Sequence, residues 1–174
     1  MTTLLIAEHD NKSLKDATSK ALTAARAFGG DVDILIVGQD CRGVAEAAAK
    51  LDGVRKVLLA EAPHLSQRLA EETAATVLPL MQNYSVLLAP ATTMGKNVLP
   101  RVAAMLDVAQ VSDIVEVKSP KIFVRPVYAG NALETVETSD KIVVGTVRTT
   151  AFASAGDSGS APIEAITPPP SAGL

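Results

Sequence analysis

The chain has 174 residues, of which 48% are hydrophobic and 20% charged, and a formal net charge of -3, which is typical of one globular domain. It has no run of Lys or Arg, which argues against nucleic-acid binding, and five aromatic residues are too few to stack several bases or sugar rings. The single Cys41 cannot form an internal disulfide, and no apolar stretch is long enough to span a bilayer. We therefore expect a soluble domain in a reducing compartment, without membrane insertion.

The first hundred residues alternate between short apolar runs and helical patterns. The apolar runs are residues 3–8, 31–38, 54–61 and 85–91, and the helical patterns are residues 11–30, 42–53, 66–79 and 96–107. Pro79 is expected to kink or end the third helix. Solid apolar runs separated by helices predict an α/β fold with a parallel sheet that is covered on both faces.

After Asp107 the pattern changes to strands without helices. Residues 112–118, 121–128, 132–138 and 140–148 are rich in strand formers and are separated by turn-like connectors. We expect them to pair antiparallel and to extend one edge of the sheet. Residues 153–174 are small, polar and proline-rich, which is typical of a linker or tail.

No complete catalytic or metal-binding set is found in the sequence. His9 follows the first predicted strand, but neither it nor His64 has a partner at metal-ligand spacing, and a surface position is the favoured interpretation. Cys41 precedes a helix that can slightly acidify its thiol, yet an inert thiol is favoured because no His lies beside it. Glu71 and Glu72 are interpreted as part of a solvated helix face.

The segment ATTMGKN, residues 91–97, is a weak candidate for an anion site. It joins the fourth predicted strand to its helix, so backbone N–H groups at the helix start, with Gly95 and Lys96, can hold an anion. It lacks a P-loop, because Pro90 and Asn97 occupy two of the positions that define that motif. The alternative, which is favoured, is a capped helix start with a solvated lysine.

Several stretches resemble one known family. RPVYAGNALETV (125–136), followed by GTVRTTAF (145–152), resembles the N-terminal domain of the electron transfer flavoprotein alpha subunit. TMGKNVLPRVAAMLDVAQVSDIVEV (93–117), LLIAEHDNKSLKDAT (4–18) and GGDVDILIVG (29–38) are similar to the same family. The resemblance covers about residues 1–155. It implies a three-layer Rossmann-like fold of the adenine nucleotide alpha-hydrolase-like class.

The resemblance also implies a heterodimer that carries electrons. In that family a second alpha-subunit domain holds most of the FAD contacts, and the beta subunit carries AMP. Electrons come from acyl-CoA and other dehydrogenases, as in fatty acid beta-oxidation, and pass to a membrane-bound quinone oxidoreductase. We therefore expect residues 1–152 to be the N-terminal domain and residues 153–174 to lead to an absent FAD domain. No catalytic or FAD-binding residue is expected in this chain, which we expect in the bacterial cytoplasm or, alternatively, the mitochondrial matrix.

The same resemblance suggests a role for the polar residues of the late strands. We expect an interface with the beta subunit and the FAD domain at four residues: Arg125, Tyr128, Asn131 and Arg148. Gly130 and Asn131 suit a turn with positive φ. The alternative is that the arginines pair with surface carboxylates, namely Glu134, Glu137 or Asp140.

Two other functions remain open from the sequence. A stand-alone nucleotide-binding module, like a universal stress protein, needs a glycine pattern that wraps phosphates, and GDSGSA (156–161) in the tail is the nearest match. A small enzyme that uses the ATTMGKN segment is weaker, because no general base lies near it in sequence.

Overall fold

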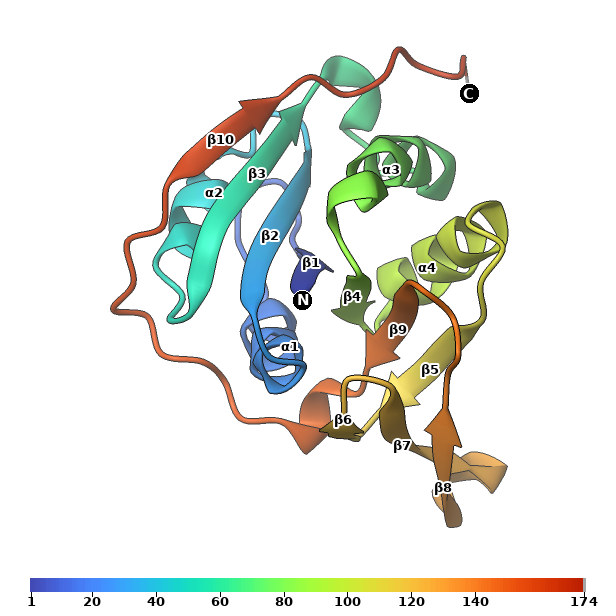
Figure 1. Cartoon of the computed structure of the whole chain (residues 1–174). Coiled ribbons are helices and arrows are strands. Elements are labelled where there is room, and N and C mark those ends of the chain that lie inside the picture. Colours follow the sequence, from blue (N-terminus) through green and yellow to red (C-terminus); the bar gives the residue numbers. More distant parts are fainter. Residues whose placement is uncertain (174) are drawn as a thin grey trace.

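The computed structural model describes residues 1–173 and shows a central sheet between helices on both faces (Figure 1). Seven strands lie in the order β10-β3-β2-β1-β4-β9-β5, and all neighbouring pairs are parallel. The strands are β1 (Thr2–Ile6), β2 (Asp31–Gly38), β3 (Val54–Glu61), β4 (Val86–Pro90), β5 (Gln110–Ile114), β9 (Val143–Val147) and β10 (Ile163–Ile166). The predicted parallel sheet with two covered faces is confirmed.

Each central strand supplies side chains to two hydrophobic cores, one on each face. The helices are α1 (Asp16–Ala27), α2 (Arg42–Ala49), α3 (Ala70–Val77) and α4 (Thr93–Met105). Leu5 packs with α1 and α2, whereas Leu4 and Ile6 pack with α3 and α4. This follows from the alternation of side chains along a strand. As Pro79 predicts, α3 ends before it and the chain continues as a 3-10 turn, η2 (Leu78–Asn83).

The late strands differ from the expectation in one respect. β9 and β5 do extend the sheet beyond β4, but they run parallel to it. The antiparallel pairing that was expected is found instead in a separate sheet of β6 (Glu116–Ser119), β7 (Ile122–Val127) and β8 (Ala132–Glu137). β9 is buried at every position, and a Cβ on its Gly145 would lie 2.8 Å from Ile114 Cδ1. Such burial on both faces is the mark of a central parallel strand.

The small sheet packs against the α1 face of the domain. Phe123 of β7 is fully buried, and its ring centroid lies 5.4 Å from that of Phe28 at the end of α1. β8 forms the outer edge of this sheet and is exposed at five of its six positions. The small sheet thus projects from the domain with one face anchored and one edge open (Figure 1).

Residues 153–173, which we call the C-terminal strap, cross the domain to the opposite edge of the main sheet (Figure 1). The segment that was expected to be a linker or tail contains β10, which pairs with β3. On the way, Gly159 N donates to the carbonyl of Lys50 (2.7 Å) and Asp52 N donates to the carbonyl of Gly156 (2.9 Å). The glycines of GDSGSA therefore allow the strap to pack closely against the α2–β3 loop. They lie at the start of β3, away from the carboxyl edge of the sheet where a phosphate site was considered.

The end of the strap is held by a buried carboxylate. Glu72 Oε1 accepts hydrogen bonds from Ser171 Oγ (2.9 Å) and Ala172 N (3.0 Å), and Glu72 is 3% exposed. The interpretation of Glu72 as a solvated residue is therefore wrong, because the strap covers this part of α3. Glu71 remains at the surface, where it accepts a hydrogen bond from Arg101 (2.7 Å).

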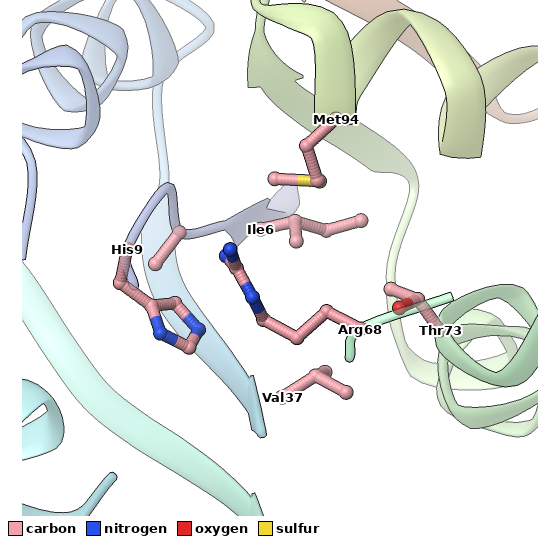
Figure 2. A pocket seen from close by; sticks show the side chains of 7 residues that line it. Ile6, His9, Val37, Arg68, Thr73 and Met94 are labelled. Carbon is pink, nitrogen blue, oxygen red and sulfur yellow. The ribbon is translucent and has the colours of Figure 1, made fainter. Parts of the chain in front are cut away.

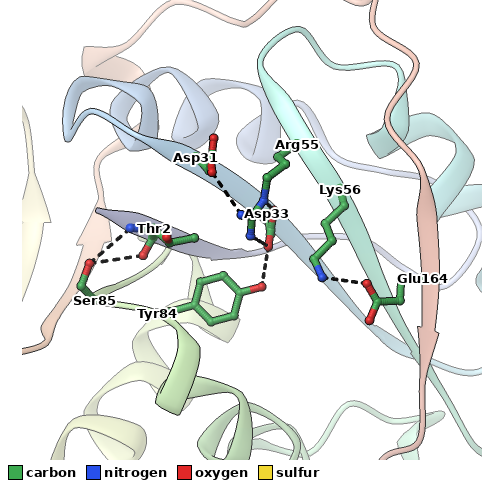
Figure 3. A network of polar contacts seen from close by, with 8 residues as sticks. All are labelled: Thr2, Asp31, Asp33, Arg55, Lys56, Tyr84, Ser85 and Glu164. Atoms are coloured by element: carbon green, nitrogen blue, oxygen red, sulfur yellow. Dashed lines mark hydrogen bonds and ion pairs between the residues drawn. The ribbon is translucent and has the colours of Figure 1, made fainter.

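A second buried carboxylate joins three strands at the amino-terminal edge of the sheet (Figure 3). Asp33 on β2 is fully buried, and it accepts hydrogen bonds from Arg55 Nε (2.8 Å) on β3 and from Tyr84 Oη (2.5 Å) before β4. Arg55 also pairs with Asp31 (3.1 Å). Burial and the bond to Asp33 raise the pKa of Tyr84 above its usual value. Arg55 and Tyr84 thus stay protonated. Arg55 balances the charge of the buried carboxylate, and Tyr84 donates a further hydrogen bond to it.

We predict that Arg55→Met destabilises the domain by about 2–3 kcal/mol, because it removes the charged partner of a buried carboxylate. Arg42→Met is the matched control, since Arg42 and Glu46 form an exposed pair on one helix at 3.6 Å, and its loss should change the stability by less than about 0.5 kcal/mol. Urea denaturation of both variants measures the two effects. Equal effects would show that the Asp33 network does not stabilise the sheet.

Candidate functional site

The carboxyl edge of the sheet between β1 and β4 is the place where the fold favours a ligand. From β1 the chain builds β2 and β3 on one side, and then returns to place β4 on the other side of β1. This is the topological switch point of an open α/β sheet, where the loops separate and leave a crevice. The residues around it come from the end of β1, the end of β2, the β3–α3 loop and the start of α4.

A small cavity lies at this point (Figure 2). Its volume is about 10 Å³, close to the space of one water molecule. It is lined by Ile6, Ala7, His9, Val37, Arg68, Thr73 and Met94. Arg68 and Met94 also line an adjoining groove of about 220 Å³, together with Gln67, Thr93, Asn97 and Val98.

His9 is buried in this region, with 2% of its surface exposed, so the expectation of a surface histidine is wrong. The tight turn after β1 folds the ring inward, where its Nδ1 accepts a hydrogen bond from Asn11 N (3.1 Å). That bond leaves the proton of a neutral ring on Nε2. Burial, and then the positive charge of Arg68, lower the pKa of His9 to about 4. The ring is neutral at physiological pH and does not add a second positive charge beside Arg68.

This burial predicts a specific loss of stability in mild acid. Because the unfolded chain binds a proton at His9 near pH 6.5 and the folded chain only near pH 4, the free energy of unfolding should fall as pH drops through this window. The difference between the two pKa values corresponds to a fall in the free energy of unfolding of about 3 kcal/mol at most. Urea denaturation between pH 7 and pH 4 measures the fall, and His9→Gln should flatten it. A fall of the same size in the variant would contradict the assignment to His9.

Gly95 and Lys96, the two residues of the anion site considered in the sequence, lie in different surroundings. Thr92 caps α4, accepting from Gly95 N (3.5 Å). Gly95 is buried against the end of β4, and a Cβ there would come within 2.0 Å of the carbonyl oxygen of Pro90. Close packing therefore explains this glycine. Lys96 is exposed and does not line the groove. The anion site at Gly95 and Lys96 stays a prediction.

Arg68 is the residue of this region that the sequence analysis missed. It belongs to no motif, and its loop carries no glycine. The one available signal was topological: the loop follows β3, and loops after parallel strands meet at the carboxyl edge of the sheet.

Cys41 does not belong to a reactive site. The thiol is fully buried, and burial followed by the charge of Glu61 raises its pKa to about 12. Glu61 is held close because its Oε1 accepts a hydrogen bond from Cys41 N (2.7 Å). The helix start suggested a slightly lowered pKa for the Cys41 thiol, whereas its pKa is raised. The thiol is therefore protonated and inert at neutral pH.

The four interface candidates lie in different surroundings around the small sheet. Tyr128 and Asn131 belong to the β7–β8 turn, which includes the 3-10 turn η3 (Tyr128–Gly130). Tyr128 is 82% exposed. Gly130 has φ of 90°, as predicted for this turn, whereas Asn131 has an ordinary φ of -75°.

The two arginines do not form the pairs that the alternative interpretation named. Arg148 donates from Nε to Asp113 Oδ2 (2.9 Å), so it is paired with a carboxylate of β5. Arg125 on β7 stands opposite Glu134 in the strand register, but its Nε is buried and has no hydrogen-bond partner within residues 1–173. Arg125 lines a crevice of about 320 Å³ between β5 and the small sheet, with Ala109, Gln110, Val111, Val136, Glu137, Thr138, Ser139 and Asp140.

Within the described chain, no three His, Cys, Asp or Glu side chains are grouped so that they can hold a metal ion. No helix of residues 1–173 is long and apolar enough to cross a membrane.

Comparison with known proteins identifies the family. Residues 3–171 match the electron transfer flavoprotein domain. The chain belongs to the electron transfer flavoprotein domain family. The resemblance found in the sequence, to the N-terminal part of the alpha subunit, is thereby confirmed.

Several named relatives are alpha subunits of electron transfer flavoproteins. The chain is 53% identical to the subunit alpha of Pseudomonas aeruginosa, over 99% of this chain and 56% of that protein. It is 55% identical to the subunit alpha of Bradyrhizobium diazoefficiens, over 95% of this chain and 53% of that protein. It is 43% identical to the mitochondrial subunit alpha of Dictyostelium discoideum, over 91% of this chain and 47% of that protein. The chain spans about half the length of the curated relatives it matches.

Proposed function

We propose that this chain acts as the N-terminal domain of an electron transfer flavoprotein alpha subunit, as a scaffold and as the surface that binds the beta subunit. The observation that carries the proposal is the family match over residues 3–171. In the complete heterodimer, electrons pass from acyl-CoA and other dehydrogenases to a membrane-bound quinone oxidoreductase. AMP is held by the beta subunit. We place the protein in the bacterial cytoplasm, in keeping with its bacterial relatives.

FAD supplies the electron-carrying chemistry of such a heterodimer, and the residues of this chain do not fit it. The groove at Arg68, the crevice at Arg125 and a crevice between α2 and the strap have volumes of about 220, 320 and 420 Å³, and none of the three is lined by an aromatic side chain. Pockets for drug-sized ligands measure about 300–1,000 Å³ and are lined largely by apolar and aromatic groups. We therefore propose that FAD is bound outside these residues, and that this chain contributes a rigid frame.

The β7–β8 hairpin is the surface that we propose for the beta subunit. Tyr128 is 82% exposed and Leu133 is 70% exposed, and both lie on the part of the small sheet that projects from the domain. β8 also has one side without a paired strand among residues 1–173. Exposed apolar side chains beside an open strand edge are features of surfaces that bind a partner, and tyrosine is enriched at such interfaces.

Arg125 and Arg148 differ in what they offer a partner. Arg148 is already paired with Asp113, so a new contact would have to compete with that bond. Arg125 has a buried Nε with no partner in the described chain, and its crevice opens beside β8. Because Arg125 forms no ion pair in the described chain, an acceptor of the partner that enters its crevice would not compete with an existing bond, which favours Arg125 over Arg148 as an interface anchor.

A chimera tests the proposed function. The chain replaces the matching N-terminal part of the Pseudomonas aeruginosa subunit alpha and is co-expressed with the beta subunit of that organism. We expect a yellow heterodimer with FAD absorption that is reduced by an acyl-CoA dehydrogenase, while the chain alone binds no flavin. Stoichiometric flavin on the isolated chain, or a chimera that folds but does not assemble, would refute the proposal.

The same chimera tests the binding surface. Tyr128→Ala and Arg125→Ala should each weaken beta-subunit binding by about tenfold or more, because central Tyr and Arg side chains dominate interface energies. Met105→Ala is the control, since Met105 is also apolar and 59% exposed but lies on α4. Binding is measured by surface plasmon resonance. Unchanged affinity in both hairpin variants would exclude this surface, even where the chimera is active.

A further inference from the structure

The end of the C-terminal strap is bound to α3 through one carboxylate, that of Glu72. Its Oε1 accepts hydrogen bonds from Ser171 Oγ (2.9 Å) and Ala172 N (3.0 Å), and Glu72 is 3% exposed. Its Oε2 lies 3.9 Å from Nε2 of His64, which is too far for a hydrogen bond. Within residues 1–173, the strap therefore supplies both hydrogen bonds that this carboxylate accepts.

Glu72 forms no ion pair with an arginine or a lysine in the described part of the chain. Arg101 on α4 pairs with the neighbouring Glu71 instead, at 2.7 Å. A buried carboxylate without such a partner depends on hydrogen-bond donors, and bonds to an ionised acceptor are roughly twice as strong as neutral ones. The contact at Glu72 is therefore stronger than two ordinary hydrogen bonds at a protein surface.

β10 is weakly held by its own pairing. It has four residues, lies at the edge of the main sheet and is paired with β3 alone. None of its residues is fully buried, and its ion pair, between Glu164 and Lys56 (2.7 Å), is partly exposed to solvent. Short, exposed edge segments open at a low free energy. β10 therefore needs support from the part of the strap that follows it.

Three prolines join β10 to the residues that Glu72 binds. Pro168, Pro169 and Pro170 have no N–H to donate, and their rings fix φ. A polyproline segment is extended and stiff, with a rise of about 3.1 Å per residue, so the three prolines span roughly 9 Å. A stiff spacer with one fixed end restricts the movement of the strand at its other end.

We infer that Glu72 is the lock of the strap, because by binding Ser171 and Ala172 it keeps β10 paired with β3. Residues 162–172 then open and close as one unit, since the proline spacer transmits the fixed position of residues 171–172 to β10. Opening exposes the edge of β3, whose backbone groups are then free to pair with another chain. The lock belongs to the domain itself and does not depend on the proposed function.

Hydrogen exchange of the 174-residue chain, followed by NMR, tests whether the strap opens as a separate unit. Val57 N donates to the carbonyl of Pro162 beside β10 (2.9 Å), and Ala7 N donates to the carbonyl of Leu35 within the main sheet (3.0 Å). We expect Val57 to exchange at least about tenfold faster than Ala7, because the strap opens without the core. Equal rates would show that the strap opens only when the whole domain unfolds, and would overturn the inference.

Glu72→Gln tests whether the lock must break when the strap opens. Weaker bonds at the lock make such an opening easier, so exchange at Val57 should rise about tenfold. Exchange at Thr138 N, which donates to the carbonyl of Lys121 in the small sheet (3.0 Å), should change less than about twofold. Glu71→Gln is the matched control variant and should change neither rate. Unchanged exchange at Val57 in Glu72→Gln would show that β10 separates while the lock holds, which refutes the inference.

Ser171→Ala tests the same contact from the strap side, and it keeps the test available if Glu72→Gln does not fold. It removes one of the two donors and leaves the charge of Glu72 in place. Exchange at Val57 should therefore rise less than in Glu72→Gln, by about threefold. No rise at Val57 would contradict a lock at this residue.

The role of the proline spacer is tested by replacing it with glycine, in a variant that combines P168G, P169G and P170G. A flexible spacer lets β10 separate while residues 171–172 stay bound. In this background Glu72→Gln should change exchange at Val57 less than about threefold, because the two sites are no longer coupled. A tenfold effect that persists with the glycine spacer would show that the prolines do not transmit the lock.

Discussion

The burial of the central strands on both faces is the constraint from which the rest of this structure follows. β1 and β4 are flanked by strands on both sides and covered by helices above and below, and their side chains are apolar except for Thr2 and Thr3 at the start of β1. Charged groups in such a sheet are restricted to the strand ends and the loops. The chemistry of the domain is therefore found at the two edges of the sheet and on the parts that project from it.

Charged side chains at the two edges of the sheet differ in the partners that they have. At the amino-terminal edge, Asp33 accepts bonds from Arg55 on β3 and from Tyr84, two residues ahead of β4, and this network joins β2, β3 and the segment that leads into β4. At the carboxyl edge, Arg68 has no acidic partner in the described chain, and the neighbouring His9 is neutral. A satisfied network of this kind stabilises a fold by itself. The polar bonds that tie strands together therefore lie at the amino-terminal edge of the sheet.

The C-terminal strap and the small sheet give the domain an asymmetric surface. The strap pairs with the edge of β3 and ends on Glu72 of α3, so β10 is the edge strand on this side of the main sheet. The small sheet instead anchors Phe123 in the core and leaves β8 open. An open strand edge invites pairing with another chain, and proteins normally protect such edges unless a partner uses them. The proposed binding of the beta subunit uses the β8 edge because Tyr128 and Leu133 are also exposed there.

The sequence alone determined the layered parallel fold, because solid apolar runs between helical patterns admit few other arrangements. It also determined the helix end at Pro79 and the family, through stretches such as residues 125–136. Only the tertiary structure decided how the late strands divide between two sheets, because the partner of each strand is set by contacts between segments that are distant in the chain. Likewise, only folding brought His9, Arg68 and Thr73 together and buried Glu72 beneath residues about 100 positions away. Burial and charge balance arise between segments that are distant in the chain, and no local pattern records them.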